Sequence, residues 1–198
     1  MIRLRCILLP RLLLTLLLLV TPSGYAGSQE PRPLGGRGLL IFPHATSTGK
    51  LRLYELPGIR LIGAIPAREL PTLAPFVTAT GGETVLAVLS SHEGWLRIVR
   101  DSVGRNAWVE LQEGWQYRSW EHYLPGRTIR LLPGFKESRY RLRSTPAEKG
   151  EPVGAAITGT ALPVRSVHGD WIRVETAGQS ETWLRWRDGD GRLLISVE

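Results

Sequence analysis

Cysteine is almost absent from this chain of 198 residues. The one cysteine, Cys6, lies in an N-terminal segment that the sequence predicts to be removed. After that removal the chain would have no disulfide, no thiolate nucleophile and no cysteine metal ligand. The fold must then be stabilised by side-chain packing, for which seven Trp residues supply a large apolar area.

Motifs for catalysis and metal binding are also lacking. The sequence has no H-E-x-x-H zinc motif, no G-x-S-x-G nucleophile motif and no glycine-rich phosphate loop. Its acidic residues are dispersed, without an opposed pair suited to glycoside hydrolysis. His92 and His168 each precede a Trp by three residues in separate turns, which is more typical of polar turn residues than of one metal site. We therefore expect no catalytic residue, no metal site, no cofactor and no enzyme.

Lysine is rare, since only three of the 25 basic residues are Lys. The formal net charge is +7, and without residues 1–26, which hold three Arg and no acid, it is +4 (25 − 3 = 22 basic against 18 acidic residues). A charge this small favours anionic surfaces in general but does not by itself indicate nucleic acid. We expect no nucleic-acid partner.

Long apolar runs are missing as well. The run over residues 12–20 has nine residues and is too short to cross a bilayer. Arginines precede it, and a helix-breaking segment with small residues follows it. This order predicts a signal peptide over residues 1–26 with cleavage after Ala26, a periplasmic or secreted protein, and no stable membrane anchor after cleavage. Residues 27–38, rich in Gly, Ser, Pro and Arg, are predicted to be a flexible lead-in.

What the sequence does contain is a tryptophan unit that occurs twice. Each copy runs from a threonine to a Trp 11 residues later (Thr84 to Trp95, Thr160 to Trp171). Apolar and polar residues alternate with period two, and glycine-containing turns interrupt them, so each copy predicts short antiparallel strands with one buried face. The core of the first copy is expected to contain Val88, Trp95 and Ile98. That of the second is expected to contain Val164, Trp171 and Val174.

The repeat extends upstream of the tryptophans. Gly36 matches Gly126 at an offset of 90 residues (126 − 36), whereas the threonines are offset by 76 (160 − 84). Such a period indicates two related domains in tandem. The surplus of the first copy is assigned to a loop insertion over residues 66–82, whose three prolines exclude a long helix or a central strand.

The second copy resembles a bacterial SH3-like domain. The resemblance rests on residues 142–146 (LRSTP), 159–160 (GT) and 169–174 (GDWIRV), and it departs from the family pattern at Thr182, where a Gly is usual. It covers residues 140–186 well and the first copy more loosely. The resemblance implies an all-β fold of two small SH3-like β-barrels in tandem. The resemblance also implies a role in attachment to peptidoglycan or to peptide partners, because similar modules attach exported proteins in this way.

The expected organisation is a first SH3-like domain over residues 39–111, an aromatic connector over residues 112–126 and a second SH3-like domain over residues 127–198. The connector is expected to form about two turns of helix, because positions 117, 120 and 124 share one helical face before a Pro-Gly stop.

Two functions follow from this organisation. The first is a non-catalytic binding module of the bacterial cell envelope that recognises peptidoglycan or a peptide or protein partner. The alternative is a structural or assembly subunit of an envelope complex with no small ligand.

Ligand-binding residues are expected where aromatic and basic side chains fall outside the repeat, in the insertion and the connector: Arg68, Leu73, Phe76, Trp115, Arg118, Trp120 and Tyr123. The same side chains could instead seal the barrel and the seam between the domains. Solvent exposure of Tyr54, Trp115, Trp120 and Tyr123 distinguishes the two interpretations, because a binding surface needs exposed rings.

Overall fold

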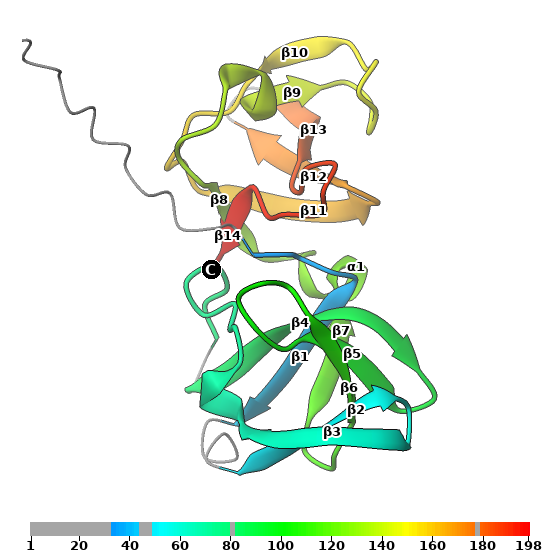
Figure 1. Cartoon of the computed structure of the whole chain (residues 1–198). Helices are drawn as coiled ribbons and strands as arrows, with labels where there is room; N and C mark the ends of the chain where they lie inside the picture. The colour runs from blue at the N-terminus through cyan, green and yellow to red at the C-terminus, as the bar shows by residue number, and fades with distance from the viewer. Residues whose placement is uncertain (1–32, 44–48, 80–81, 177–178) are drawn as a thin grey trace, which may run out of the picture. The chain divides into compact units, whose positions relative to one another are not determined.

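The computed structural model of the chain describes residues 33–43, 49–79, 82–176 and 179–198, with side chains 179–181 excepted (Figure 1). Strands make up almost all regular structure in these ranges, which confirms the all-β class. The predicted signal peptide and the first part of the predicted lead-in, residues 1–32, lie outside the described residues. Within the described ranges, no helix has the length and apolar character needed to cross a membrane.

The first sheet has seven antiparallel strands in the order β3-β2-β6-β5-β4-β1-β7. Its strands alternate inward apolar and outward polar or aromatic residues, as β5 shows with its buried Leu96 and Ile98. The strands are β1 (Gly38–Pro43), β2 (Lys50–Leu56), β3 (Ile59–Pro66), β4 (Glu83–His92), β5 (Trp95–Val99), β6 (Asn106–Glu110) and β7 (Gln116–Ser119).

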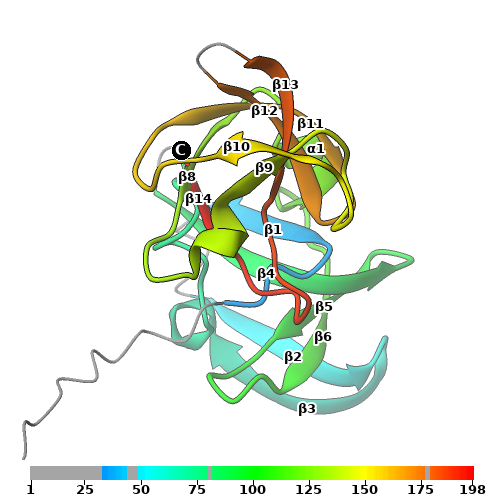
Figure 2. The ribbon, with the colours of Figure 1, turned by 90° about the horizontal axis from the view of Figure 1, so that it is seen from above.

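The second sheet repeats this topology. Its order is β10-β9-β13-β12-β11-β8-β14, which is the first order with seven added to every strand number. Figure 2 shows both sets of strands from above. The strands are β8 (Thr128–Leu131), β9 (Arg141–Arg143), β10 (Pro152–Ala155), β11 (Leu162–His168), β12 (Trp171–Thr176), β13 (Gln179–Arg185) and β14 (Ile195–Val197).

The central tryptophans occupy equivalent places in the two sheets. Trp95 pairs with His92 across the β4–β5 hairpin, and Trp171 pairs with His168 across the β11–β12 hairpin. Glycines of the matching upstream motifs also agree, since Gly36 and Gly126 both have positive φ, 61° and 80°. The internal repeat found in the sequence is therefore a repeat of structure.

The expected closure into two barrels is not found in the described residues. Each sheet runs from one edge strand to another, from β3 to β7 and from β10 to β14. The last strands are short, with four residues in β7 and three in β14. Strands of this length offer few backbone groups for closure, and one edge of each is already paired with the first strand of its sheet.

The connector also differs from the two helical turns expected of it. Its residues Gln116–Ser119 form β7, which pairs with β1, and only one helical turn, α1 (Trp120–Tyr123), follows. Exposure alternates along β7, so the local pattern has period two. Pairing with β1 satisfies the backbone groups that a helix would have satisfied internally, and the extended form therefore prevails.

Two hydrophobic clusters form the interior. One lies on the inner face of the first sheet and includes Leu40, Phe42, Leu86, Val88 and Ile98. The other joins apolar residues of the second sheet to the opposite face of β1 and β4, which contributes Leu39, Ile41, Val85 and Ala87. Because both faces of β1 are covered, five of its consecutive residues are buried. The described residues of both sheets accordingly lie in one compact unit.

Five of the six residues expected in the core are buried: Val88, Ile98, Val164, Trp171 and Val174. Trp95 is only half-buried, because it occupies an outward position of β5. Its ring meets that of Tyr54 edge-on, with centroids 5.1 Å apart.

Candidate functional site

The insertion is anchored to the rest of the fold. Leu73 is buried, and its backbone N–H donates to the carbonyl of Val85 at 2.8 Å. The N–H of Thr78 donates to the carbonyl of Val197, and the N–H of Val197 donates to the carbonyl of Phe76. Phe76 is half-buried and packs against the same core. The insertion is therefore packed against the fold and does not form an open lid. This packing is the role of its apolar residues that competes with ligand binding.

Two of the connector aromatics lie in the core. Trp120 is 1% exposed, and its indole N–H donates to the carbonyl of Gly35 at 2.7 Å. Tyr123 is 4% exposed and lies under the guanidinium of Arg127, 4.1 Å from its ring centroid. Burial raises the pKa of the Tyr123 hydroxyl. Trp120 therefore offers almost no ring surface to a ligand, and Tyr123 offers only the small part that lines a surface pocket beside Arg118.

The remaining sequence-predicted residues lie apart. Trp115 is half-buried and stacks on Phe42, with ring centroids 4.9 Å apart. Arg118 is exposed on β7 and donates to the side chain of Gln116 at 2.9 Å. Arg68 is exposed on a 3-10 turn, η2 (Ala67–Glu69). The structure thus brings Leu73, Trp120 and Tyr123 together in one core cluster but does not join the seven residues into one surface.

A groove on the first sheet does include one of them. This first groove has a volume of about 170 Å³ and lies along β2, β6 and the turn after β6. On β2, buried Leu51 and Leu53 alternate with outward Arg52 and Tyr54, which places the latter pair in the groove. Its lining consists of Lys50, Leu51, Arg52, Tyr54, Val109, Glu110, Gln112 and Trp115.

The chemistry of the first groove suits an extended ligand. Tyr54 and Trp115 keep part of their rings accessible, and Lys50 and Arg52 are exposed beside them. Aromatic faces stack on sugar rings or on proline, and basic side chains pair with carboxylates. Such a groove can bind a glycan or a peptide without any chemical step.

The second sheet has a groove at the equivalent position. Tyr54 of the first groove pairs with Trp108, and in the second sheet Arg143 pairs with Trp183 in the same way. In the neighbouring strand pairs, β5–β6 and β12–β13, Trp95 pairs with Glu110, whereas Trp171 pairs with Arg185. The tyrosine and the glutamate of the first groove are therefore replaced by two arginines in the second.

This second groove is larger and strongly basic. Its volume is about 420 Å³, and it lies between β9, β13 and the 3-10 turn η3 (Glu137–Tyr140). Five basic side chains and one carboxylate line it. The lining residues are Lys136, Ser138, Arg139, Arg141, Arg143, Glu148, Trp171, Arg185 and Gly189.

The sequence-based prediction missed this second groove, although a signal for it is present. Arg141 and Arg143 flank Leu142, and Arg185 follows Leu184. Both leucines are buried, so period-two alternation places all three arginines on one outward face once the two strands are known to be neighbours. The pairing of β9 with β13 belongs to the tertiary structure, and residue spacing along the chain does not predict it.

Metal ligands do not gather at either groove. Across residues 33–43, 49–79, 82–176 and 179–198, no three His, Cys, Asp or Glu side chains stand close enough to hold a metal ion. His92 and His168 lie at hairpin ends of different sheets.

The chain was compared with known families, curated proteins and solved structures. No family model and no curated protein matches the chain. Among solved structures, the chain is similar to "Endolysin LysPBC5 CBD", with 13% sequence identity over 84% of this chain and 98% of that chain and a TM-score of 0.25.

Proposed function

We propose that this protein is an exported, non-catalytic binding module of the bacterial cell envelope, and that its first groove recognises peptidoglycan or an extended peptide. The observation that carries the proposal is the pair of partly accessible rings, Tyr54 and Trp115, set beside Lys50 and Arg52 in one groove. Peptidoglycan and acidic peptides both offer carboxylates to the basic groups. Sugar rings or proline rings offer faces to the aromatic groups.

Both sheets are further proposed to be variants of the SH3-like module, in tandem and joined by a segment with one helical turn. The identical strand orders support this, as do the matching positions of Trp95 and Trp171. A tandem of modules can raise the avidity for a polymer with repeated units, because the second contact forms at a high effective concentration.

The test is retention of the purified protein on purified peptidoglycan. Tyr54→Ala and Trp115→Ala should each reduce the bound fraction, with the melting temperature measured in parallel to correct for unfolded protein. Trp108→Ala is the matched control, because Trp108 is also an outward aromatic of the first sheet but does not line the groove. Unchanged retention per folded molecule in both groove variants would refute the proposed site.

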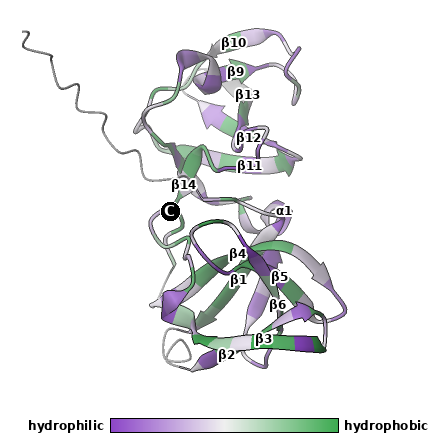
Figure 3. Ribbon diagram, viewed as in Figure 1, coloured by the Kyte–Doolittle hydropathy of each residue, from purple (hydrophilic) through white to green (hydrophobic). Residues whose placement is uncertain are grey.

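A structural role in an envelope complex is the second candidate, and a different surface favours it. The β2–β3 hairpin exposes the apolar residues Leu56, Ile59 and Leu61, which are 53%, 63% and 55% exposed. Figure 3 shows much of β3 in the hydrophobic colour, at the edge of its sheet. Exposed apolar edge strands are suited to pairing with another protein. An envelope-protein pull-down that loses a partner on Ile59→Lys, while peptidoglycan is not bound, would favour this candidate.

The proposal that the protein is exported rests on the signal-peptide pattern of residues 1–26. Mass spectrometry of the protein from its native host should give a chain that begins at Gly27. An intact Met1 terminus in a cytoplasmic fraction would refute export.

A further inference from the structure

The second groove holds more positive charge than its own carboxylate can balance. Five basic side chains face one glutamate, Glu148. Two of the basic groups, Arg143 and Arg185, are also largely buried, with side chains 14% and 17% exposed. Burial, and next the charge of Arg139, lower the pKa of Arg185. A concave, partly desolvated site with this charge excess favours an anion.

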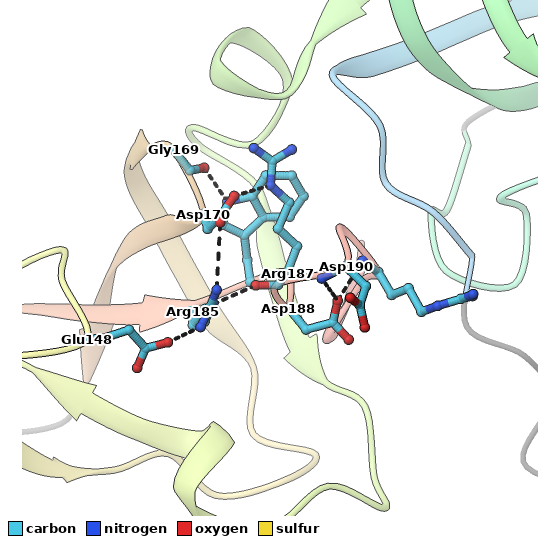
Figure 4. A network of polar contacts seen from close by, with 9 residues as sticks. Glu148, Gly169, Asp170, Arg185, Arg187, Asp188 and Asp190 are labelled. Carbon is cyan, nitrogen blue, oxygen red and sulfur yellow. Dashed lines mark hydrogen bonds and ion pairs between the residues drawn. The ribbon is translucent and has the colours of Figure 1, made fainter.

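Glu148 shows what kind of anion fits. Its Oε1 accepts a hydrogen bond from Nη1 of Arg185, and its Oε2 lies 3.8 Å from Nη2 of Arg143. One carboxylate therefore spans the two buried guanidinium groups. Yet the Glu148 side chain is 61% exposed and belongs to the turn between β9 and β10 (Figure 4). Because this carboxylate stays mostly in solvent, another carboxylate can exchange with it.

The guanidinium of Arg185 is held from behind by other groups. Its Nε donates to the carbonyl of Arg187 at 2.9 Å, and its Nη2 lies 3.8 Å from Oδ2 of Asp170. Asp170 itself accepts from Nε of Arg187, whose Nη1 donates to the carbonyl of Gly36 at 2.7 Å. These contacts fix Arg185 with Nη1 directed at Glu148. A guanidinium fixed in this way loses little side-chain entropy when it binds a ligand.

We propose that the second groove is a carboxylate-binding site for an extended acidic peptide, and that Glu148 occupies it until a ligand carboxylate displaces it. Arg143 and Arg185 would hold the displacing carboxylate. Arg139 and Arg141 lie exposed at the same groove and would pair with further carboxylates along the peptide. The site is separate from the first groove, where Tyr54 and Glu110 stand at the two positions of the arginines. It therefore does not depend on the proposed envelope function.

Removal of the internal competitor tests the proposal most directly. Binding of a fluorescently labelled hexaglutamate peptide to the purified protein would be measured by anisotropy. Glu148→Ala should tighten binding by about two- to fivefold, because the solvent-exposed Glu148 carboxylate competes only weakly for the two guanidinium groups. Glu175→Ala is the matched control, because Glu175 forms an exposed ion pair with Arg165 outside the groove and its loss changes the net charge equally. It should leave the affinity unchanged.

Removal of the cations is the second arm. Arg185→Gln should weaken binding by about tenfold or more, because a charge-assisted hydrogen bond to the ligand is lost. Since Arg185 is partly buried, the exposed Arg141 gives a variant with less risk to the fold, and Arg141→Gln should weaken binding about two- to fivefold. Arg165→Gln removes the same charge outside the groove and should have no effect.

Three outcomes would overturn the proposal. Equal effects of the groove variants and their controls would mean that only net charge attracts the peptide. No change in affinity on Glu148→Ala would mean that Glu148 does not occupy the site. Displacement of the peptide by inorganic phosphate at lower concentration than by glutarate would mean that the groove selects phosphate and not carboxylate. Failure of peptidoglycan binding at the first groove would leave all three measurements unaffected.

Discussion

Trp120 and Trp186 pack against each other with ring centroids 5.1 Å apart and ring planes tilted by 53°. Trp120 begins α1 after the first sheet, and Trp186 follows β13 of the second, so the contact joins residues of the two repeats. Each indole N–H donates to a glycine carbonyl, that of Gly35 at 2.7 Å and that of Gly169 at 2.9 Å. Both side chains are 1% exposed and belong to the cluster shared by the two sheets.

Loss of either tryptophan should destabilise the whole unit. Trp120→Ala is expected to cost about 3 to 5 kcal/mol of unfolding free energy, because it leaves a large cavity. Trp120→Phe keeps most of the ring but loses the bond to Gly35, and should cost less. Calorimetry should show one cooperative transition that moves to lower temperature in both variants. Two separate transitions, only one of which moves, would show that the sheets unfold independently.

Gly38 should not tolerate a side chain. A Cβ at this position would lie 2.4 Å from the carbonyl oxygen of Arg118 and 2.9 Å from Cα of Ser119, both of them backbone atoms of the paired strand β7. Gly38→Ala is expected to cost about 1 to 3 kcal/mol in urea unfolding. Gly154→Ala is the control, because its Cβ would meet only Cδ1 of Leu142 at 3.8 Å. Equal stabilities of the two variants would contradict the close approach of β1 and β7.

Tyr123 should make stability sensitive to alkali. Burial raises the pKa of its hydroxyl above the usual 10.0, an effect that the charge of Arg127 opposes and the charge of Glu83 supports. The folded state therefore favours the neutral phenol. This contribution is complete below the unfolded pKa and is lost as the pH rises through the folded pKa. Urea unfolding across that range should show a loss of stability that is smaller in Tyr123→Phe. The same loss in both proteins would exclude Tyr123 as its source.

The two central tryptophans should differ in their effect on stability despite their equivalent places. Trp171 is 8% exposed, and its replacement by Ala should cost about 3 to 5 kcal/mol. Trp95 is half-buried and meets Tyr54 edge-on, so Trp95→Ala should cost less. Chemical denaturation of both variants measures the difference. A larger loss for Trp95 would mean that its outward position is more important than its burial indicates.

The sequence was sufficient for what depends on local pattern. Period-two alternation predicted β5 and β12, and the repeat of Thr, Trp and Gly positions predicted that Trp95 and Trp171 are equivalent. Each of these features is decided by residues within one hairpin.

What the sequence did not supply depends on partners distant along the chain. Residues Gln116–Ser119 fit one face of a helix as well as a short strand, and pairing with β1 decides between them. From the sequence alone, Trp120 is one of several aromatic residues of the connector. Its contacts with Gly35 and Trp186, which place it in the core, are seen only in the structure. The arginines of the second groove are brought together by the pairing of β9 with β13, which rests on one register position, Trp183 with Arg143.

The strand β14 pairs with β8, and its Val197 also exchanges hydrogen bonds with the insertion near Phe76 and Thr78. A chain made from its N-terminus produces the insertion more than a hundred residues before Val197. Until then, Leu73 and Val77 lack the strand that completes the cover of their cluster. Completion of the first half of the fold must therefore await the last strand. A ribosome-bound chain would keep this apolar segment accessible to a chaperone.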